Sequence, residues 1–420
     1  MKRAQIRGLE SEVLDCNGDS REKADLLTGP CFEPSVFFRC HSWRKAGLAD
    51  VRTQVWHCAF ESDVRHPEQT TDVIATCGGN SICFIDVNSG FVKSKYYAED
   101  PREIFYTLSW SWIAPECSGS GKISIVAAGG TRCIIHLLHP QNGALFYTHR
   151  LKCPSSVAIT SLLFHKEHCE ILFGAKSDGT ILVWDIGYPV PPKYAVKFTT
   201  LHQLSSKHEV FQLAYCLETK SLLVSSADGI CVWSGDVRDT SLQEKELKMP
   251  PMPGSINVNS PQLVDSIEVL GCGRIAAKCA LHGAIYIWSL AETLKSCKSR
   301  RIVKILPAYT LKWSNTDNYF MNMGFSKGSG VLACGDDEGR LWLYDTKNLF
   351  DNSEITNHSE VNPVCVLQWP DVVDNNVIKR HKCNLDSYDT TVINKVAINY
   401  AGNCMVAVTS NNLVCIWKRK

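Results

Sequence analysis

Short apolar runs, each bounded by small and polar residues, recur along this chain, and one of them shows the pattern clearly. Residues 177–179 are turn formers, residues 180–183 form an apolar run rich in branched side chains, and Trp184 and Asp185 close it. Gly179 supplies the backbone freedom that a tight turn needs, and branched residues favour a pleated, half-buried strand. The pattern therefore predicts a turn followed by a β-strand.

The same strand ending occurs in seven places. The copies cover residues 81–86, 133–138, 180–185, 229–234, 284–289, 340–345 and 413–417. Their spacing lies near the WD-repeat period of roughly 40–45 residues in the early copies and is longer later, where residues 236–262 and 350–390 are expected to form loops. We therefore predict an all-β fold, a seven-bladed WD40 β-propeller.

The two ends of the chain are predicted to close this ring. The last copy is the third strand of its blade and lacks an outer strand, and residues 35–41 are the natural donor. Closure removes the exposed sheet edges that would otherwise aggregate. Residues 1–34 mix charged residues, Ser, Gly and Asp without periodicity, which favours disorder. The predicted organisation is a disordered tail over residues 1–34 and a propeller over residues 35–420.

Composition argues against several functional classes. Lys and Arg total 44 against 43 Asp and Glu, so the net charge of +1 gives no global reason to bind nucleic acid or membranes. The 20 cysteines form no Cys-x-x-Cys pair and mostly lie in apolar runs, where they act as small buried residues. The first residues lack an apolar signal-peptide core, and no stretch is long enough to span a bilayer. We expect an intracellular, reducing environment, no membrane partner and no sequence-specific nucleic-acid site.

Motifs of catalysis are missing from the sequence. It contains no P-loop, no glycine-rich dinucleotide turn, no Gly-x-Ser-x-Gly and no His-Glu-x-x-His. The nearest approach to a metal cluster is His165, His168 and Cys169, in the predicted turn between the first two strands of the third blade. A polar surface loop is the more ordinary interpretation there. We expect no enzymatic activity, no catalytic residue, no cofactor and no metal.

Alignment of the innermost strands gives the clearest functional signal. Each strand ends in a bulky residue: Phe60, Trp110, Phe164, Tyr215, Val269, Phe325 and Ile398. Counting back four residues gives Trp56, Tyr106, Thr160, Phe211, Asp265, Met321 and Asn394, which should lie near one mouth of the central channel. Tyr319 and Phe320 directly precede Met321. We predict that Trp56, Tyr106, Tyr319 and Phe320 form a cage for a quaternary ammonium, where each good cation–π contact contributes ~0.5–2 kcal/mol. The alternative is that these rings only pack against neighbouring loops.

Two propeller families resemble this chain over nearly all of residues 35–420. Residues 104–110 and 125–130 are similar to the run around the second blade of the Polycomb methyl-lysine reader EED. The aromatic cage of EED falls on Trp56 and Tyr106, and approximately on Tyr319 and Phe320. This resemblance implies recognition of methylated lysine.

The closer resemblance is to the WD domain of the leucine-rich repeat and WD repeat-containing protein 1 family. It rests on residues 40–42, 53–61, 75–79, 182–187 and 334–345, which match in order and outside the repeat pattern. It implies a nuclear chromatin factor that binds subunits of the origin recognition complex and licensing factors, and that reads repressive trimethyl-lysine marks on histone tails. It also implies support of replication initiation and of heterochromatin, including centromeric and telomeric regions. Residues 1–34 contain no Leu-x-x-Leu-x-Leu pattern, so functions that need the leucine-rich repeats are not carried over.

Two other functions remain open at this point. One is a plain interaction platform that does not distinguish methylated from unmodified peptides. The other is a substrate receptor of a cullin ubiquitin ligase, which usually carries Trp-Asp-x-Arg at a strand end. Here Asp185 is followed by Ile186 and Gly187, which disfavours that alternative.

Overall fold

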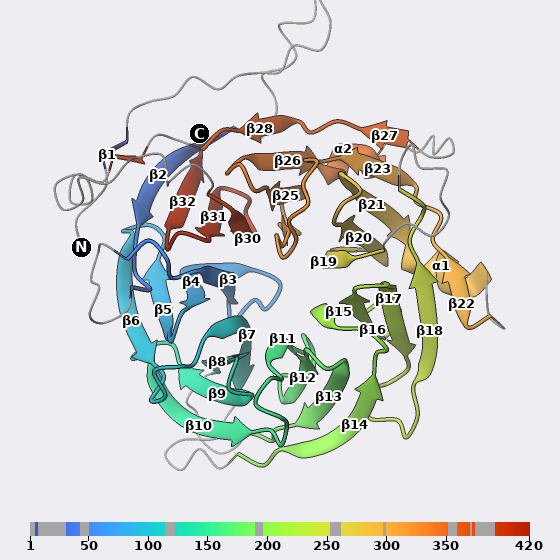
Figure 1. Cartoon of the computed structure of the whole chain (residues 1–420), viewed down its shortest axis with the longest axis horizontal. Coiled ribbons are helices and arrows are strands. Elements are labelled where there is room, and N and C mark those ends of the chain that lie inside the picture. Colours follow the sequence, from blue (N-terminus) through green and yellow to red (C-terminus); the bar gives the residue numbers. More distant parts are fainter. Residues whose placement is uncertain are drawn as a thin grey trace, which may run out of the picture.

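The computed structural model describes residues 5–6, 31–42, 50–113, 122–189, 196–252, 262–296, 300–351, 359–369, 372–373 and 391–420. In these residues, seven sheets of four or five strands stand around a central channel, in the order of the sequence (Figure 1). The predicted seven-bladed propeller is confirmed.

Each blade is a sheet whose first strand lines the channel. Blade one holds β3 (Val55–Ser62), β4 (Thr70–Gly78), β5 (Ser81–Asp86) and β6 (Phe91–Tyr97). Blade two holds β7 (Phe105–Ile113), β8 (Ile123–Gly130), β9 (Ile134–His139) and β10 (Ala144–Arg150). Blade three holds β11 (Ile159–Phe164), β12 (Ile171–Lys176), β13 (Thr180–Asp185) and β14 (Thr199–Ser205).

The later blades carry additional strands. Blade four holds β15 (Val210–Cys216), β16 (Ser221–Ser226), β17 (Gly229–Ser234) and β18 (Gln243–Lys248), extended by β22 (Ile302–Lys304). Blade five holds β19 (Val264–Gly271), β20 (Arg274–Cys279), β21 (Ala284–Ser289) and β23 (Tyr309–Lys312), extended by β27 (Ser359–Val361). Blade six holds β24 (Gly324–Phe325), β25 (Val331–Gly335), β26 (Leu341–Asp345) and β28 (Cys365–Leu367). The helices α1 (Leu290–Ser296) and α2 (Thr346–Asp351) follow β21 and β26, and β1 (Gln5–Ile6) pairs with β29 (Val372–Val373).

Blade seven is closed by the first and last parts of the described chain. It holds β30 (Ile393–Ile398), β31 (Cys404–Thr409) and β32 (Val414–Arg419), and β2 (Phe32–Phe38) pairs antiparallel with β32 as its outer strand. The closure by an early strand is thus as predicted. The strand begins at Phe32 rather than at Ser35, because Phe32 is buried in the core of blade seven at 2% exposure. The remainder of the predicted tail lies almost entirely outside the described residues.

The second strands form the core between blades because both of their faces are covered. Every residue of β12, β16 and β31 is buried, which explains why these strands consist mainly of small and apolar residues rather than an alternating pattern. The glycine of the initial motif is required by its backbone. Gly179 has φ +85°, and a Cβ there would meet the carbonyl oxygen of Ser206 at 2.5 Å.

Three expectations from the sequence need correction or refinement. The inner strand of blade six contains only Gly324–Phe325, and side chains of blade five hold the backbone that precedes it. The expected loop 236–262 includes β18, the regular outer strand of blade four. The expected loop 350–390 includes β27 and β28.

All cysteines in the described parts of the chain are free and most are buried.

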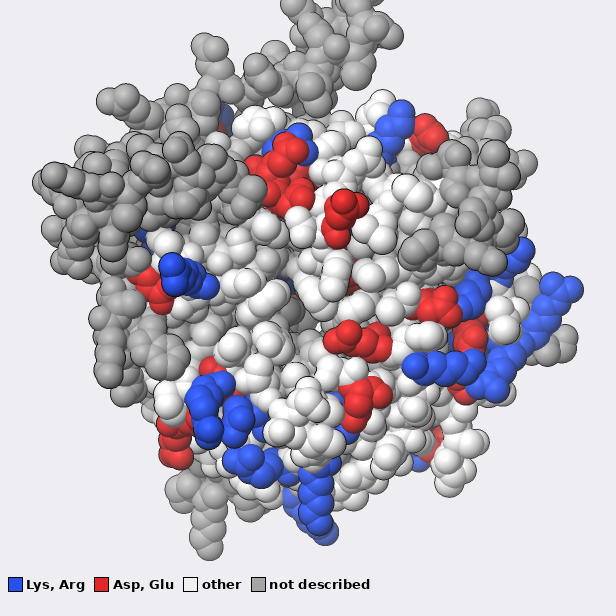
Figure 2. Space-filling model, viewed as in Figure 1, with Lys and Arg blue, Asp and Glu red and all other residues white. Residues whose placement is uncertain are grey.

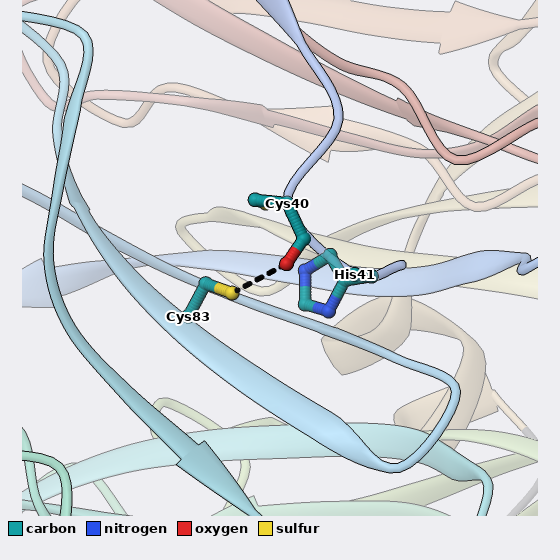
Figure 3. A group of neighbouring side chains, drawn as sticks. All are labelled: Cys40, His41 and Cys83. Atoms are coloured by element: carbon teal, nitrogen blue, oxygen red, sulfur yellow. Dashed lines mark hydrogen bonds between the residues drawn. The ribbon is translucent and has the colours of Figure 1, made fainter. Parts of the chain in front are cut away.

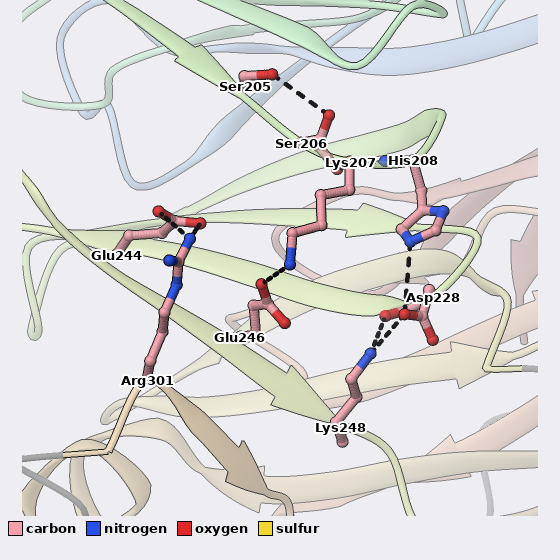
Figure 4. Close-up of polar contacts among 9 residues, drawn as sticks. All are labelled: Ser205, Ser206, Lys207, His208, Asp228, Glu244, Glu246, Lys248 and Arg301. Carbon is pink, nitrogen blue, oxygen red and sulfur yellow. Dashed lines mark hydrogen bonds and ion pairs between the residues drawn. The ribbon is translucent and has the colours of Figure 1, made fainter. Parts of the chain in front are cut away.

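Ion pairs link β18 of blade four to the segments on either side of it (Figure 4). Arg301, which precedes β22, pairs with Glu244 of β18 at 3.0 Å, and Lys207 pairs with Glu246 at 2.7 Å. Exposed pairs of this kind contribute little each, ~0–1 kcal/mol. The burial of Val303 in the core shared by blades four and five therefore holds β22 more firmly than the Arg301 ion pair does. Among the described helices, none has the length and apolar character needed to cross a membrane.

Candidate functional site

The channel-mouth positions share a backbone feature, a β-bulge at the start of the inner strand. The register skips Trp56, Tyr106, Thr160, Phe211, Asp265 and Asn394, one residue in each of blades one to five and seven. A bulge leaves its extra residue unpaired and turns its side chain out of the regular alternation. The repeated bulge therefore brings these six side chains to equivalent positions around one mouth.

Aromatic rings gather at this mouth from blades one, two, four and six. The ring centroids of Trp56 and Tyr106 lie 5.5 Å apart at 88°, and those of Trp56 and Phe320 lie 6.4 Å apart at 87°. Phe320 also meets Phe211 edge to face at 5.1 Å. We call Trp56, Tyr106, Phe211, Tyr319 and Phe320 the mouth cluster. A quaternary ammonium is attracted to a ring face within about 6 Å, so rings at these separations can share one cation.

The structure brings together three of the four predicted cage residues directly. Trp56 contacts both Tyr106 and Phe320, whereas the ring contacts of Tyr319 are with Phe320 at 4.7 Å and Phe211 at 6.2 Å. Tyr319 remains 46% exposed and thus lies at the outer side of the cluster. Phe211 was not among the predicted cage residues, although its position in the strand alignment was available. Its role depends on where the blade-six segment places Phe320, and no local sequence pattern reports that.

The segment before β24 carries Tyr319 and Phe320 and is fixed by buried polar groups. Asp265 Oδ2 accepts a hydrogen bond from the Met321 amide at 3.3 Å, and Ser266 Oγ accepts one from the Met323 amide at 2.9 Å. Lys278 Nζ bonds Asp265 Oδ2 at 2.6 Å, with both side chains fully buried. Burial raises the pKa of Asp265, and the charge of Lys278 opposes that rise. Asp265, the channel-mouth residue of blade five, therefore holds the segment of blade six that carries Tyr319 and Phe320.

A hollow of about 630 Å³ opens beside the mouth cluster, between blades one and two. Trp56 and Tyr106 form part of its lining, together with Thr53, Gln54 and Ile104. Burial raises the pKa of Tyr106, and the nearby Glu103 adds to that rise, so its ring stays neutral at physiological pH. The site thus combines aromatic faces with an adjacent space of the size of a short peptide segment.

In the histidine cluster of blade three, His165 uses one ring nitrogen to bind backbone amides. His165 Nδ1 accepts hydrogen bonds from the amides of Glu167 and His168 at 3.1 and 3.0 Å. Burial lowers the pKa of His165 to about 4, because the charged ring would be desolvated. His165 Nδ1 therefore caps this turn.

A second group of possible metal ligands, Cys40, His41 and Cys83, lies at the ring closure (Figure 3). His41 Nδ1 and Ser81 Oγ are 2.9 Å apart, His41 Nε2 and Thr76 Oγ1 are 2.8 Å apart, and Cys83 Sγ donates to the Cys40 carbonyl at 3.4 Å. Both ring nitrogens are therefore occupied by hydroxyl groups. The group fastens the segment after β2 to blade one, and we assign it a structural role.

Comparisons with known proteins agree with the architecture. The sequence model of the family described as leucine-rich repeat and WD repeat-containing protein 1, WD domain, matches residues 25–420. The protein of that name from Danio rerio is 30% identical over 404 residues, covering 92% of this chain and 50% of the relative. The human protein is also 30% identical, over 399 residues, covering 92% of this chain and 58% of the relative.

A more distant relative is Polycomb protein esc of Drosophila melanogaster. It is 22% identical over 303 residues, covering 65% of this chain and 66% of the relative. The chain spans about half the length of the Danio rerio and human relatives. Because the family model covers nearly the whole chain, the protein belongs to the leucine-rich repeat and WD repeat-containing protein 1 family, whose WD domain it contains.

Proposed function

We propose that this propeller is a chromatin scaffold that reads trimethylated lysine on histone tails. The ammonium group would lie among Trp56, Tyr106 and Phe320, with Tyr319 covering the outer side and Phe211 supporting Phe320. The propeller surface would hold the origin recognition complex and its licensing factors in the nucleus. In this way it would support replication initiation and heterochromatin organisation.

The observation that carries this proposal is the arrangement of the mouth cluster. Trp56 stands nearly perpendicular to both Tyr106 and Phe320, so the three rings bound a corner instead of forming a stack. Trp56, Tyr106 and Phe320 are only partly buried, and Tyr319 is exposed. Rings that served only as core would be fully covered, as Phe84 and Phe105 are. The hollow beside Trp56 offers space for the residues that flank the methylated lysine.

The remaining parts of the proposal have a different basis. The origin recognition complex, the licensing factors and the nuclear location come from the resemblance to the family. The relation to a protein named Polycomb protein esc supports a role at chromatin. The family match and the seven-bladed WD-repeat fold support a role as a scaffold without catalysis.

Peptide titration tests methyl-lysine reading directly. Histone H3 peptides with unmodified or trimethylated lysine are titrated into the wild-type protein and into Trp56→Ala. Losing one ring face removes ~0.5–2 kcal/mol of cation–π attraction, so we expect the affinity for the methylated peptide to fall about 2- to 30-fold. The unmodified peptide should bind weakly to both proteins.

Two controls separate cation–π recognition from general loss of surface. Phe91→Ala removes an exposed ring, 55% accessible, at the start of β6 and should leave the affinity unchanged. A peptide in which a neutral tert-butyl group replaces the trimethylammonium has the same shape without the charge and should bind more weakly. Equal affinity of wild-type protein for methylated and unmodified peptides would instead establish the plain interaction platform.

A further inference from the structure

The edge of blade four presents an unpaired strand. The sheet order is β15-β16-β17-β18-β22, so β22 is the outermost strand, and in the described part of the chain no strand pairs with its outer side. β22 runs parallel to β18, with Glu246 opposite Ile302 and Lys248 opposite Lys304. An unpaired strand edge is a template for a further strand.

The backbone of β22 divides its hydrogen-bonding groups between two sides. The Arg301 carbonyl accepts from the Glu246 amide at 2.8 Å, and the Ile305 amide donates to the Lys248 carbonyl at 2.9 Å. In a parallel ladder every second residue faces the neighbouring strand, so residues 301, 303 and 305 serve β18. The amide and carbonyl groups of Ile302 and Lys304 consequently face away from the sheet.

The side chains alternate in the same segment. Val303 and Ile305 are 4% and 2% exposed and belong to the core shared by blades four and five. The outward face reads Arg300, Ile302, Lys304 and Leu306, all of them exposed. Ile302 is 55% exposed, and Leu306, at 85%, is the most exposed large apolar side chain in the described residues. The edge therefore shows an alternating series of cationic and apolar side chains.

The charges of this series differ from those of the surrounding rim. Figure 2 shows basic and acidic side chains together on the part of the rim where Figure 1 places β18 and β22. There Lys207, Lys248 and Arg301 each have a carboxylate partner. Among the ion pairs of the described residues, none includes Arg300 or Lys304. Short charged edge strands also discourage unwanted pairing, but that role does not account for outward-facing Ile302 and Leu306.

We propose that the outer edge of β22 binds an extended, acidic and apolar segment of a partner protein by strand addition. The segment would pair its backbone with the outward groups of Ile302 and Lys304. On its exposed face, carboxylates would lie opposite Arg300 and Lys304, and apolar side chains opposite Ile302 and Leu306, the cross-strand pairing that stabilises sheets. This surface lies on the rim and is independent of the mouth cluster.

A designed peptide serves as the probe. Fluorescein-labelled Glu-Thr-Val-Thr-Glu-Thr-Leu-Thr is titrated into the full chain and its binding followed by anisotropy. Ile302→Pro removes one outward amide, which β18 does not use, so the ladder of blade four should survive and peptide affinity should fall at least tenfold. Leu306→Ser should weaken binding by a similar factor through the side-chain contact alone.

Matched controls distinguish strand addition from non-specific peptide binding. Glu360→Pro places a proline at the corresponding outward position of β27, whose neighbour Ser359 donates toward β23, and should change nothing. A peptide of the same composition without alternation, and one with N-methylated backbone amides, should not bind to the wild-type protein. The N-methylated probe gives the answer even if Ile302→Pro fails to fold.

Three results would contradict strand addition at β22. Unchanged affinity in a folded Ile302→Pro protein, or equal binding of the non-alternating or N-methylated peptide, would overturn the proposal. Binding of a DNA duplex of about 20 base pairs with a steep salt dependence, in place of the peptide, would assign the basic rim to phosphate contacts instead.

Discussion

At the scale of single residues, the site depends on a backbone conformation that phenylalanine rarely adopts. Phe320 has φ +67°, in the left-handed region. For a residue with a Cβ this costs roughly 1–2 kcal/mol, and such costs concentrate at functional sites, where the surroundings hold the strained residue. Here the conformation places Phe320 between Trp56 and Phe211.

Two substitutions at Phe320 distinguish the contribution of its ring to binding from the cost of its backbone conformation to stability. Phe320→Gly and Phe320→Ala both remove the ring, so both should lose affinity for methylated peptide. Glycine tolerates the left-handed conformation, and we expect Phe320→Gly to be about 1 kcal/mol more stable than Phe320→Ala in urea unfolding, the reverse of their usual order in regular strands. If the alanine protein is as stable as the glycine protein, Phe320 carries no strain.

Repetition in the sequence is what allowed individual residues of the candidate site to be predicted. Counting back along seven similar strands located Trp56 and Tyr106, because six of these strands carry the same bulge. It could not assign Phe211, which acts through a contact with Phe320 across the channel mouth. That contact follows from the left-handed backbone conformation at Phe320. The identity of residue 320 does not reveal this conformation, because phenylalanine rarely adopts it.

At the scale of elements, a buried ion pair controls the segment from Trp313 to Met323. Lys278 Nζ lies 4.2 Å above the Trp313 ring centroid and 2.6 Å from Asp265 Oδ2. Asp265 in turn holds the Met321 amide. Lys278 is thus connected to both ends of the segment that carries Tyr319 and Phe320.

Replacing this pair in two ways tests its positioning role. Lys278→Met alone leaves a buried, unpaired carboxylate and should cost about 3–5 kcal/mol of stability. Adding Asp265→Asn removes the charge and keeps an acceptor for Met321, so stability and methyl-peptide affinity should largely return. Adding Asp265→Leu instead removes the acceptor, and affinity should stay low even where the protein remains folded. Equal affinities in the two double variants would show that the pair acts on stability only.

Short elements are where the sequence was least informative. β22, β24 and β27 contain two or three residues each, and charged or polar neighbours surround them. Their formation depends on tertiary contacts, such as the burial of Val303 against blade four, and not on an apolar run of their own. The seven third strands, by contrast, repeat an apolar pattern that predicts them without any tertiary information.

At the scale of the whole molecule, the ring depends on one strand from the opposite end of the described chain. β2 supplies Phe37, 1% exposed, whose ring lies 5.4 Å from that of Trp369 and 5.5 Å from that of Trp417. The segment after β2 then reaches blade one, where His41 hydrogen-bonds Thr76 and Ser81. Closure therefore joins blades six, seven and one, on which the mouth cluster in turn depends for Trp56 and Phe320.

Weakening this closure should affect stability and ligand binding together. Phe37→Ala removes a fully buried ring and should lower the free energy of unfolding by about 3–5 kcal/mol. Phe91→Ala, an exposed ring, should change it by no more than about 0.5 kcal/mol. Because β2 covers the edge of β32, the Phe37→Ala protein should also associate through that edge on warming, as size-exclusion chromatography would detect. If only β2 detached while the other blades kept their thermal transition, closure would be local, and the mouth cluster should then retain its affinity for methylated peptide.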